Sequence, residues 1–214
     1  MSEQDIKNSV QKGTTTIGIV CKEGIVLAAD KRASAGYRIA NKKMDKVALV
    51  SDNMAITMAG LVSDAQLITK LARAEIRLKE LRTHKQLKVK EVANMMGSIL
   101  YANIRRMSMV PGIVSFLLGG KDSTGFGLYE LGVDGSVSSI DDFVSVGSGS
   151  DLALGVLEGL FKEGLTLKEG VELAKKAINS AVQRDMPTGD GIDIFVIDAQ
   201  GARKVFHKKI EYSI

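Results

Sequence analysis

Residues 12–32 read KGTTTIGIVCKEGIVLAADKR. Two short runs rich in β-branched residues, 14–21 and 25–30, are separated by Lys22-Glu23-Gly24, and this spacing predicts a β-hairpin. Three threonines stand together directly after Gly13, where the apolar residues behind them predict a buried strand. Hydroxyl groups at the start of such a strand are either ordinary β-branched strand residues or groups that carry a reaction.

Composition narrows the class of protein. The chain has 214 residues, 45% of them hydrophobic, which is enough for one compact core. No run approaches the ~20 apolar residues of a membrane span, and the polar first 13 residues lack the apolar centre of a secretory signal, so we expect a cytoplasmic protein. The single cysteine, Cys21, cannot form an internal disulfide and is expected to be a buried thiol.

Charge and histidine content argue against two classes of site. The net charge is +4, but the basic residues are scattered among acidic ones without interleaved aromatics, so a solvated surface is a better interpretation than a nucleic-acid site. His84 and His207 have no partner at metal-ligand spacing. We therefore expect no metal site.

The rest of the chain alternates between strands and pairs of helices. Further strands are predicted at 45–50, 54–59, 113–119, 125–130, 136–140, 191–198 and 202–207. One helix is predicted to begin at a capping box of Ser63 and Gln66 and to have one apolar face, made of Leu67, Leu71, Ala74, Leu78 and Leu81. Other helices are predicted at 89–106, from 150 to 161, and behind a capping box of Thr166 and Glu169.

Helices that arrive in pairs do not form the single-helix crossovers of a doubly wound parallel sheet. The order instead predicts an α+β protein: a four-layer αββα sandwich, with two antiparallel sheets packed face to face and helix pairs outside. No linker or repeat interrupts the chain, so no domain boundary is expected after residue 13.

Most familiar catalytic signatures are missing. Gly119-Gly120-Lys121-Asp122 lacks the first glycine and the hydroxyl of a P-loop, and Val146 spoils a nucleophile elbow around Ser148. A threonine needs a base, and an N-terminal threonine supplies one with its own α-amine, whose pKa of about 7.7–8.0 suits neutral pH. The bond between Gly13 and Thr14 would then be a cleavage point; the alternative, a plain strand start, stays open on these residues alone.

Several spaced motifs resemble the proteasome β-subunit family of the archaeal type, within the N-terminal-nucleophile hydrolases. They are GTTTIGI at 13–19, AADKR at 28–32, Met44-Asp45-Lys46, AGLV at 59–62, GSGS at 147–150, GVLE at 155–158, and QRD at 183–185 before GDG at 189–191. The resemblance covers almost the whole chain from Thr14 onward.

This resemblance implies a threonine endopeptidase subunit of the 20S proteasome core that hydrolyses peptide bonds of unfolded proteins without a cofactor. It implies that residues 1–13 are a propeptide removed by autocatalytic cleavage, leaving 14–214 as the mature domain. The implied partners are proteasome α subunits and other β subunits, in stacked seven-membered rings, and an ATPase regulator.

The resemblance also implies roles for individual residues. The implied catalytic set is Thr14 as nucleophile, Asp30 and Lys46 as its charged partners, Gly60 as the oxyanion N–H donor, and Ser148, Asp185 and Thr188 as the groups that orient the α-amine. Arg32 matches a supporting position near Asp30, and Thr188 stands where many relatives have serine. The implied pocket for the substrate side chain before the cut is Ala33, Met44, Ala48, Met58 and Val62, none charged, which predicts a chymotrypsin-like preference.

Two other functions stay open at this point. A catalytically silent ring or assembly subunit would share the fold, although such subunits usually lose the threonine or the lysine, and this chain retains both. A small-molecule amidase of the same superfamily is the other alternative, and activity on casein against activity on a small acyl-amide would separate the two.

Overall fold

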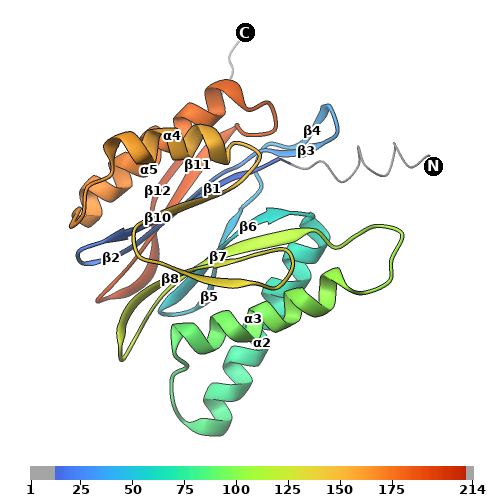
Figure 1. The fold of residues 1–214 in the computed structure, drawn as a ribbon, viewed down its shortest axis with the longest axis vertical. Coiled ribbons are helices and arrows are strands. Elements are labelled where there is room, and N and C mark those ends of the chain that lie inside the picture. The colour runs from blue at the N-terminus through green and yellow to red at the C-terminus, as the bar shows by residue number, and fades with distance from the viewer. Residues whose placement is uncertain (1–12, 211–214) are drawn as a thin grey trace.

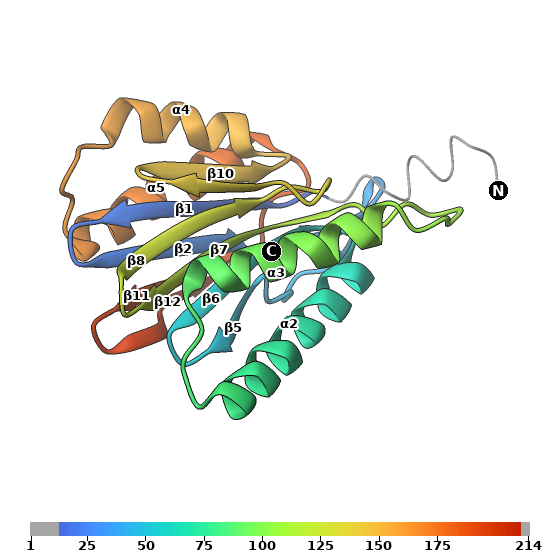
Figure 2. The same ribbon diagram turned by 60° about the horizontal axis from the view of Figure 1, so that its bottom comes forward.

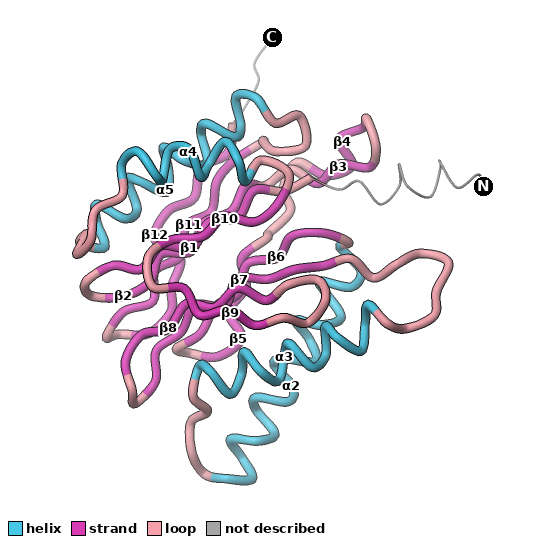
Figure 3. Tube along the Cα trace, viewed as in Figure 1, coloured by secondary structure: helices cyan, strands magenta, loops and turns pink. Residues whose placement is uncertain are grey.

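The computed structural model describes residues 13–210; the predicted propeptide therefore lies, except for Gly13, outside the described residues. Two antiparallel five-stranded sheets face one another, and a pair of helices covers the outer face of each (Figures 1 and 2). Figure 3 shows the helices confined to the two outer layers and the strands to the two inner ones. The predicted α+β sandwich is confirmed.

The first sheet carries the threonine run. Its strand order is β10-β1-β2-β11-β12. The strands are β1 (Thr15–Cys21), β2 (Gly24–Asp30), β10 (Phe143–Gly147), β11 (Gly191–Asp198) and β12 (Gly201–Lys209). Strands β1 and β2 form the predicted hairpin, and β10 pairs with the other edge of β1, Thr15 opposite Gly147. This pairing brings the segment after Gly147 beside Thr14, although the two are far apart in sequence.

The second sheet has the order β5-β6-β7-β8-β9. Its strands are β5 (Val47–Ser51), β6 (Met54–Gly60), β7 (Val114–Asp122), β8 (Gly125–Leu131) and β9 (Val137–Ile140). A separate ribbon pairs β3 (Ala33–Ala35) with β4 (Arg38–Asn41). The predicted strands all form, with ends shifted by a few residues, whereas β3, β4 and β10 had not been predicted.

Four helices of the described chain complete the outer layers. Helices α4 (Ser150–Leu160) and α5 (Leu167–Arg184) cover the first sheet, and α2 (Val62–Thr83) and α3 (Val89–Ile104) cover the second. The predicted capping box at the start of α5 is confirmed, because the Thr166 hydroxyl accepts from the Glu169 N–H and the Glu169 carboxylate accepts from the Thr166 N–H. None of the helices at residues 13–210 is long and apolar enough to cross a membrane.

Apolar side chains fill three layers, one between the sheets and one beneath each helix pair. The layer between the sheets includes Leu27, Leu117 and Phe195. Cys21 belongs to the layer under α4 and α5, and burial, with the nearby charges of Glu23 and Glu169, raises the pKa of its thiol to about 12. The expected buried thiol is confirmed.

The predicted apolar face of α2 is not the face that packs on the sheet. The helix packs on the second sheet through Ala65, Ile68, Ala72 and Ile76, while the predicted leucines are 39–55% exposed. Alanine at two of the contact positions lets the helix backbone approach the sheet closely, which the longer leucines would prevent. The predicted capping box at Ser63 does not form either, since the helix begins one residue earlier with Leu61 at its N-cap.

Candidate active site

Thr14 lies directly before β1 and is only 4% exposed. Its hydroxyl donates a hydrogen bond to the carbonyl oxygen of Gly13, 2.8 Å away, so the hydroxyl lies beside the peptide bond that precedes it. The Gly13 N–H is directed to Ser34 Oγ at 3.3 Å, and a Cβ on Gly13 would lie 1.8 Å from Pro187 Cβ. Only glycine fits immediately before this threonine.

Asp30 is fully buried at the end of β2 and accepts four hydrogen bonds. Oδ1 accepts from the Thr15 N–H at 3.0 Å and from Lys46 Nζ at 2.7 Å. Oδ2 accepts from the N–H groups of Arg32 and Gly189, each at 3.0 Å. A carboxylate satisfies all four donors, whereas an asparagine amide would direct its own N–H groups at two of them.

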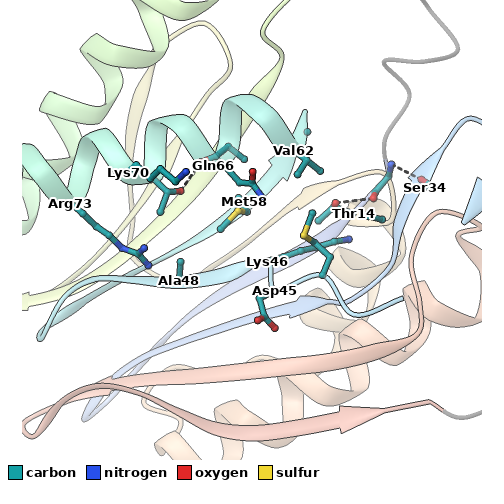
Figure 4. Close-up of a pocket in the computed structure, with 16 residues that line it drawn as sticks. Thr14, Ser34, Asp45, Lys46, Ala48, Met58, Val62, Gln66, Lys70 and Arg73 are labelled. Carbon is teal, nitrogen blue, oxygen red and sulfur yellow. Dashed lines mark hydrogen bonds between the residues drawn. The ribbon is translucent and has the colours of Figure 1, made fainter. Parts of the chain in front are cut away.

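Lys46, just before β5, has a side chain that is 5% exposed and extends toward Thr14 (Figure 4). Burial lowers the pKa of its ammonium, and the charge of Arg32 adds to this. The charge and hydrogen bond of Asp30, and the charge of Asp185, oppose the shift; the net pKa is below the ordinary value of a lysine. This lysine is therefore easier to deprotonate than one in water.

A chain of hydroxyl groups leads from Thr14 to one carboxylate. The Thr14 N–H lies 3.3 Å from Ser148 Oγ, which in turn donates to Asp185 Oδ2 at 2.6 Å. The Thr188 hydroxyl donates to the same oxygen at 2.5 Å. Since Thr188 spends its only proton there, the Thr15 hydroxyl, 2.7 Å away, donates to Thr188. The extra methyl of Thr188, relative to serine, leaves this contact intact.

Arg32 holds the loop that carries Asp185 and Thr188 against Asp30. Its guanidinium pairs with Asp190, Nε to Oδ2 at 2.8 Å, and also donates to the carbonyl oxygen of Met186 at 2.7 Å. This agrees with the supporting position expected from the sequence.

A cavity of about 300 Å³ opens beside Thr14. Thr14, Lys46 and Gly60 line it, and so do all five residues expected to form the substrate pocket: Ala33, Met44, Ala48, Met58 and Val62 (Figure 4). Gly60 has a φ of 119°, and a Cβ there would lie 2.3 Å from the carbonyl oxygen of Ile113. Glycine is therefore required at this point of the cavity wall.

Sequence reasoning missed part of the cavity. Besides Ser34 and Asp45, one face of α2 continues the cavity wall beyond the predicted Val62, through Ala65, Gln66, Thr69, Lys70 and Arg73. Lys70 and Arg73 stand at the end away from Thr14 (Figure 4), and Arg73 Nε donates to the carbonyl oxygen of Leu49 at 2.7 Å. The helical spacing from Val62 onward was a signal that could have found these residues.

The seven predicted catalytic residues thus meet in one place, three in the cavity wall and four in the hydrogen-bond network behind it. Every buried side-chain nitrogen and oxygen atom among the described residues has a hydrogen-bond partner. Such a network fixes its members in one geometry. The site thus brings together a hydroxyl next to a carbonyl, a buried cation with a depressed pKa, and an adjoining cavity.

Comparison with known proteins gives one consistent family. The family model "Proteasome subunit" matches residues 10–197. The chain is 39% identical over 207 residues to a proteasome subunit beta of Archaeoglobus profundus, covering 97% of this chain and 94% of that protein. It is 41% identical over 197 residues to a proteasome subunit beta 2 of Aeropyrum pernix, covering 92% and 87%. It is 38% identical over 205 residues to a proteasome subunit beta of Methanopyrus kandleri, covering 95% and 96%.

Proposed function

Because the chain belongs to the proteasome subunit family, as a β subunit of the 20S core with that family's threonine peptidase activity, we propose that Thr14 is its nucleophile once residues 1–13 are removed. The observation that carries this proposal is the hydroxyl of Thr14, 2.8 Å from the Gly13 carbonyl oxygen and in the same cavity wall as Lys46. The presence of both residues in one site argues against a catalytically silent subunit.

The first reaction is self-cleavage. Thr14 Oγ1 attacks the carbonyl carbon of Gly13, the bond from that carbon to the Thr14 nitrogen breaks, and the nitrogen takes up the hydroxyl proton to become a free α-amine. Water then hydrolyses the ester, which restores the hydroxyl and releases residues 1–13 with a carboxyl group on Gly13. Tight packing of Gly13 against Pro187 holds the bond in place for this step.

Turnover of substrates repeats the chemistry with a different base. The free α-amine, held by Ser148, accepts the proton of Thr14 Oγ1 as the oxygen attacks the substrate carbonyl, and then passes it to the leaving amine. Lys46, as a cation, favours the neutral amine and the developing alkoxide. The Gly60 N–H stabilises the oxyanion, a contribution of about 3 kcal/mol for donors of this type. Water hydrolyses the resulting ester.

The cavity supports cleavage after large apolar residues. Its walls include Met44 and Met58, whose flexible thioethers adapt to leucine or tyrosine side chains. The far end carries Lys70 and Arg73, so a basic substrate side chain would meet like charges there. Burying the charge of a substrate side chain without a partner costs at least ~2 kcal/mol. We expect the order Leu and Tyr first, then Glu, then Arg.

Fluorogenic peptides that end in Leu, Tyr, Glu or Arg test this order on the assembled complex. The leucine and tyrosine peptides should have a kcat/KM at least about tenfold above that of the arginine peptide. Met58→Arg should raise kcat/KM for the glutamate peptide and lower kcat/KM for the leucine peptide, because it adds a cation to the apolar part of the cavity. Met107→Arg, a change at a fully exposed methionine outside the cavity, should leave the ranking as it is. A wild-type preference for arginine would refute the pocket assignment.

The chain assembles with other proteasome subunits. We further propose that it forms seven-membered β rings between rings of α subunits in the cytoplasm, with an ATPase regulator feeding unfolded substrates. Exposed leucines at helical spacing on α2 support a partner on this face, since apolar side chains gathered on a surface often mark an interface: Leu67, Leu71, Leu78 and Leu81. Confinement in rings would also protect the cell from uncontrolled proteolysis.

Activity should therefore depend on assembly. Expressed alone, the chain should retain residues 1–13 and show less than about 1% of the peptidase activity of the complex. The reason is that the cavity beside Thr14 would lack the neighbouring subunits that stabilise it. Mixing with its cognate α subunit should produce both the processed mass and the activity. Size exclusion, intact mass and peptidase assays on the same fractions provide the measurement, and full activity in a monomer fraction would contradict the proposal.

A further inference from the structure

Two Asp-Lys pairs of the sequence, Asp30-Lys31 and Asp45-Lys46, exchange ion pairs in the structure. Lys46 Nζ lies 2.7 Å from Asp30 Oδ1, and Lys31 Nζ lies 2.6 Å from Asp45 Oδ1. The function proposed above uses Asp30 and Lys46 and assigns nothing to the other two residues. Yet Asp45 lines the cavity and directly precedes Lys46.

Lys31 is anchored from the other side as well. Its side chain is 3% exposed, and Nζ lies 2.7 Å from Oδ2 of Asp193, a residue of β11 that is itself buried. Asp193 is fixed in turn by β12, since its Oδ1 lies 2.6 Å from His207 Nδ1 and its Oδ2 lies 3.3 Å from Lys204 Nζ. The ammonium of Lys31 therefore ties Asp45 to the β11-β12 hairpin.

The backbone of Lys31 holds two segments of the active site. Its carbonyl oxygen accepts from the Met44 N–H at 3.0 Å, two residues before Lys46. Its N–H donates to the Gly189 carbonyl oxygen at 3.1 Å, next to Thr188. Both contacts are short enough to be ordinary hydrogen bonds. Lys31 is thus in contact with both segments that carry the groups around Thr14.

The two buried lysines differ in charge behaviour. Burial lowers the pKa of Lys31, but its hydrogen bonds to Asp193 and Asp45 more than compensate, and its pKa is above the ordinary value. The pKa of Lys46, with one bonded carboxylate, is below it. Lys31 therefore holds its proton more tightly than an ordinary lysine, as suits an ionic anchor, and Lys46 holds its proton less tightly.

We propose that Lys31 is a positioning residue for Lys46: by binding Asp45 and Asp193 together it fixes the segment 44–46 and keeps Lys46 against Asp30. This inference rests on the proposed role of Lys46 in the reaction of Thr14. Without the anchor, the segment 44–46 would keep its backbone contact to Lys31 but lose its ionic one, and the contact from Lys46 to Asp30 would lengthen.

Asp45→Ala tests the anchor without touching the buried pair of Lys31 and Asp193, because the Asp45 side chain is 69% exposed. In the assembled, processed complex, kcat for a leucine peptide should fall about tenfold. The weaker contact with Asp30 should lower the pKa of Lys46 further, so activity should be lost at a pH about half a unit lower on the basic side. The other charges that face Lys46, on Asp185 and Arg32, are unchanged.

Three variants control the experiment. Asp45→Glu keeps a carboxylate, and the exposed position leaves room for the longer side chain to reach Lys31. Its kcat and pH profile should therefore be those of the wild type. Arg203→Ala breaks an exposed ion pair with Asp198 at the far end of the same β11-β12 hairpin and should change neither. If Asp45→Ala fails to assemble, Asp45→Asn, which has the same size and no charge, is measured with the same expected shift.

The possible outcomes separate this inference from the function beneath it. An Asp45→Ala complex with wild-type kcat and an unmoved pH profile, alongside an inactive Lys46→Ala complex, would overturn the anchor and leave the proposed function standing. A change in KM alone would also overturn it, because it would reduce Asp45 to a wall of the pocket. If the Lys46→Ala complex is fully active, the role of Lys46 in the proposed function is itself wrong.

Discussion

A Thr14→Ala protein is expected to keep residues 1–13 and to have no measurable peptidase activity, even when fully assembled. Among the three adjacent threonines, it is the Thr14 hydroxyl that donates a hydrogen bond to the Gly13 carbonyl oxygen, at 2.8 Å. The neighbouring Thr15 hydroxyl is committed to Thr188, and the Thr16 hydroxyl donates to the Val146 carbonyl oxygen. Without a nucleophile, both self-cleavage and turnover should fall by at least about a thousandfold.

Intact mass and N-terminal sequencing of the assembled complex measure the first effect, and hydrolysis of a leucine peptide measures the second. Thr14→Ser retains a hydroxyl and should still be processed. Thr16→Val removes a buried hydroxyl two residues further on, without loss of shape, and should be processed and active. Recovery of a Thr14→Ala chain that begins at residue 14 would show that another group, or another protease, cuts this bond.

Local sequence signals predicted most of the fold. Hairpin turns such as Lys22-Glu23-Gly24 and the capping box of Thr166 and Glu169 act within a few residues, and the structure has both. Strand β4 was missed because all its residues are exposed, so it has no apolar alternation to read. Strand β10 becomes a strand by pairing with β1, a partner far away in sequence.

The face of α2 shows why pattern alone can mislead. Its leucines have the regular spacing of a buried stripe, but the helix buries the smaller residues Ala65 and Ala72 with Ile68 and Ile76. A subunit of a larger assembly has two kinds of apolar face, one for its own core and one for partners, and spacing cannot tell them apart.

The candidate site could be predicted residue by residue only through the resemblance to a family. Nothing local connects Asp30 to Gly189, or Ser148 to Asp185; strand pairing and the loop around Thr188 bring them together. The anchor at Lys31 could not be predicted at all, because its contact with Asp193 depends on how β11 pairs with β2. The sequence tells which kinds of side chain are present, whereas the register of strands that are far apart in sequence determines which side chains come into contact.

Lys46→Ala is expected to abolish peptidase activity, by at least about a thousandfold, in chains that already begin at Thr14. Expressing the chain without residues 1–13 separates turnover from self-cleavage, which the substitution should also block. The loss has two causes: the cation that shares a cavity wall with Thr14 disappears, and the Asp30 carboxylate loses a donor at 2.7 Å while it stays fully buried. The measurement is kcat/KM for a leucine peptide on assembled complexes.

The second cause is also a risk to the fold, since a buried charge left without its partner typically costs about 3–5 kcal/mol. Lys46→Arg keeps a cation for Asp30 and so protects the assembly. Because a planar guanidinium is larger than an ammonium and places its charge differently, this variant should assemble and remain nearly inactive. Lys43→Ala, an exposed lysine three residues earlier, should behave like wild type. If Lys46→Arg assembles and keeps activity within tenfold of wild type, a positive charge alone is sufficient at this position, and the compact shape of the Lys46 ammonium has no part in the reaction.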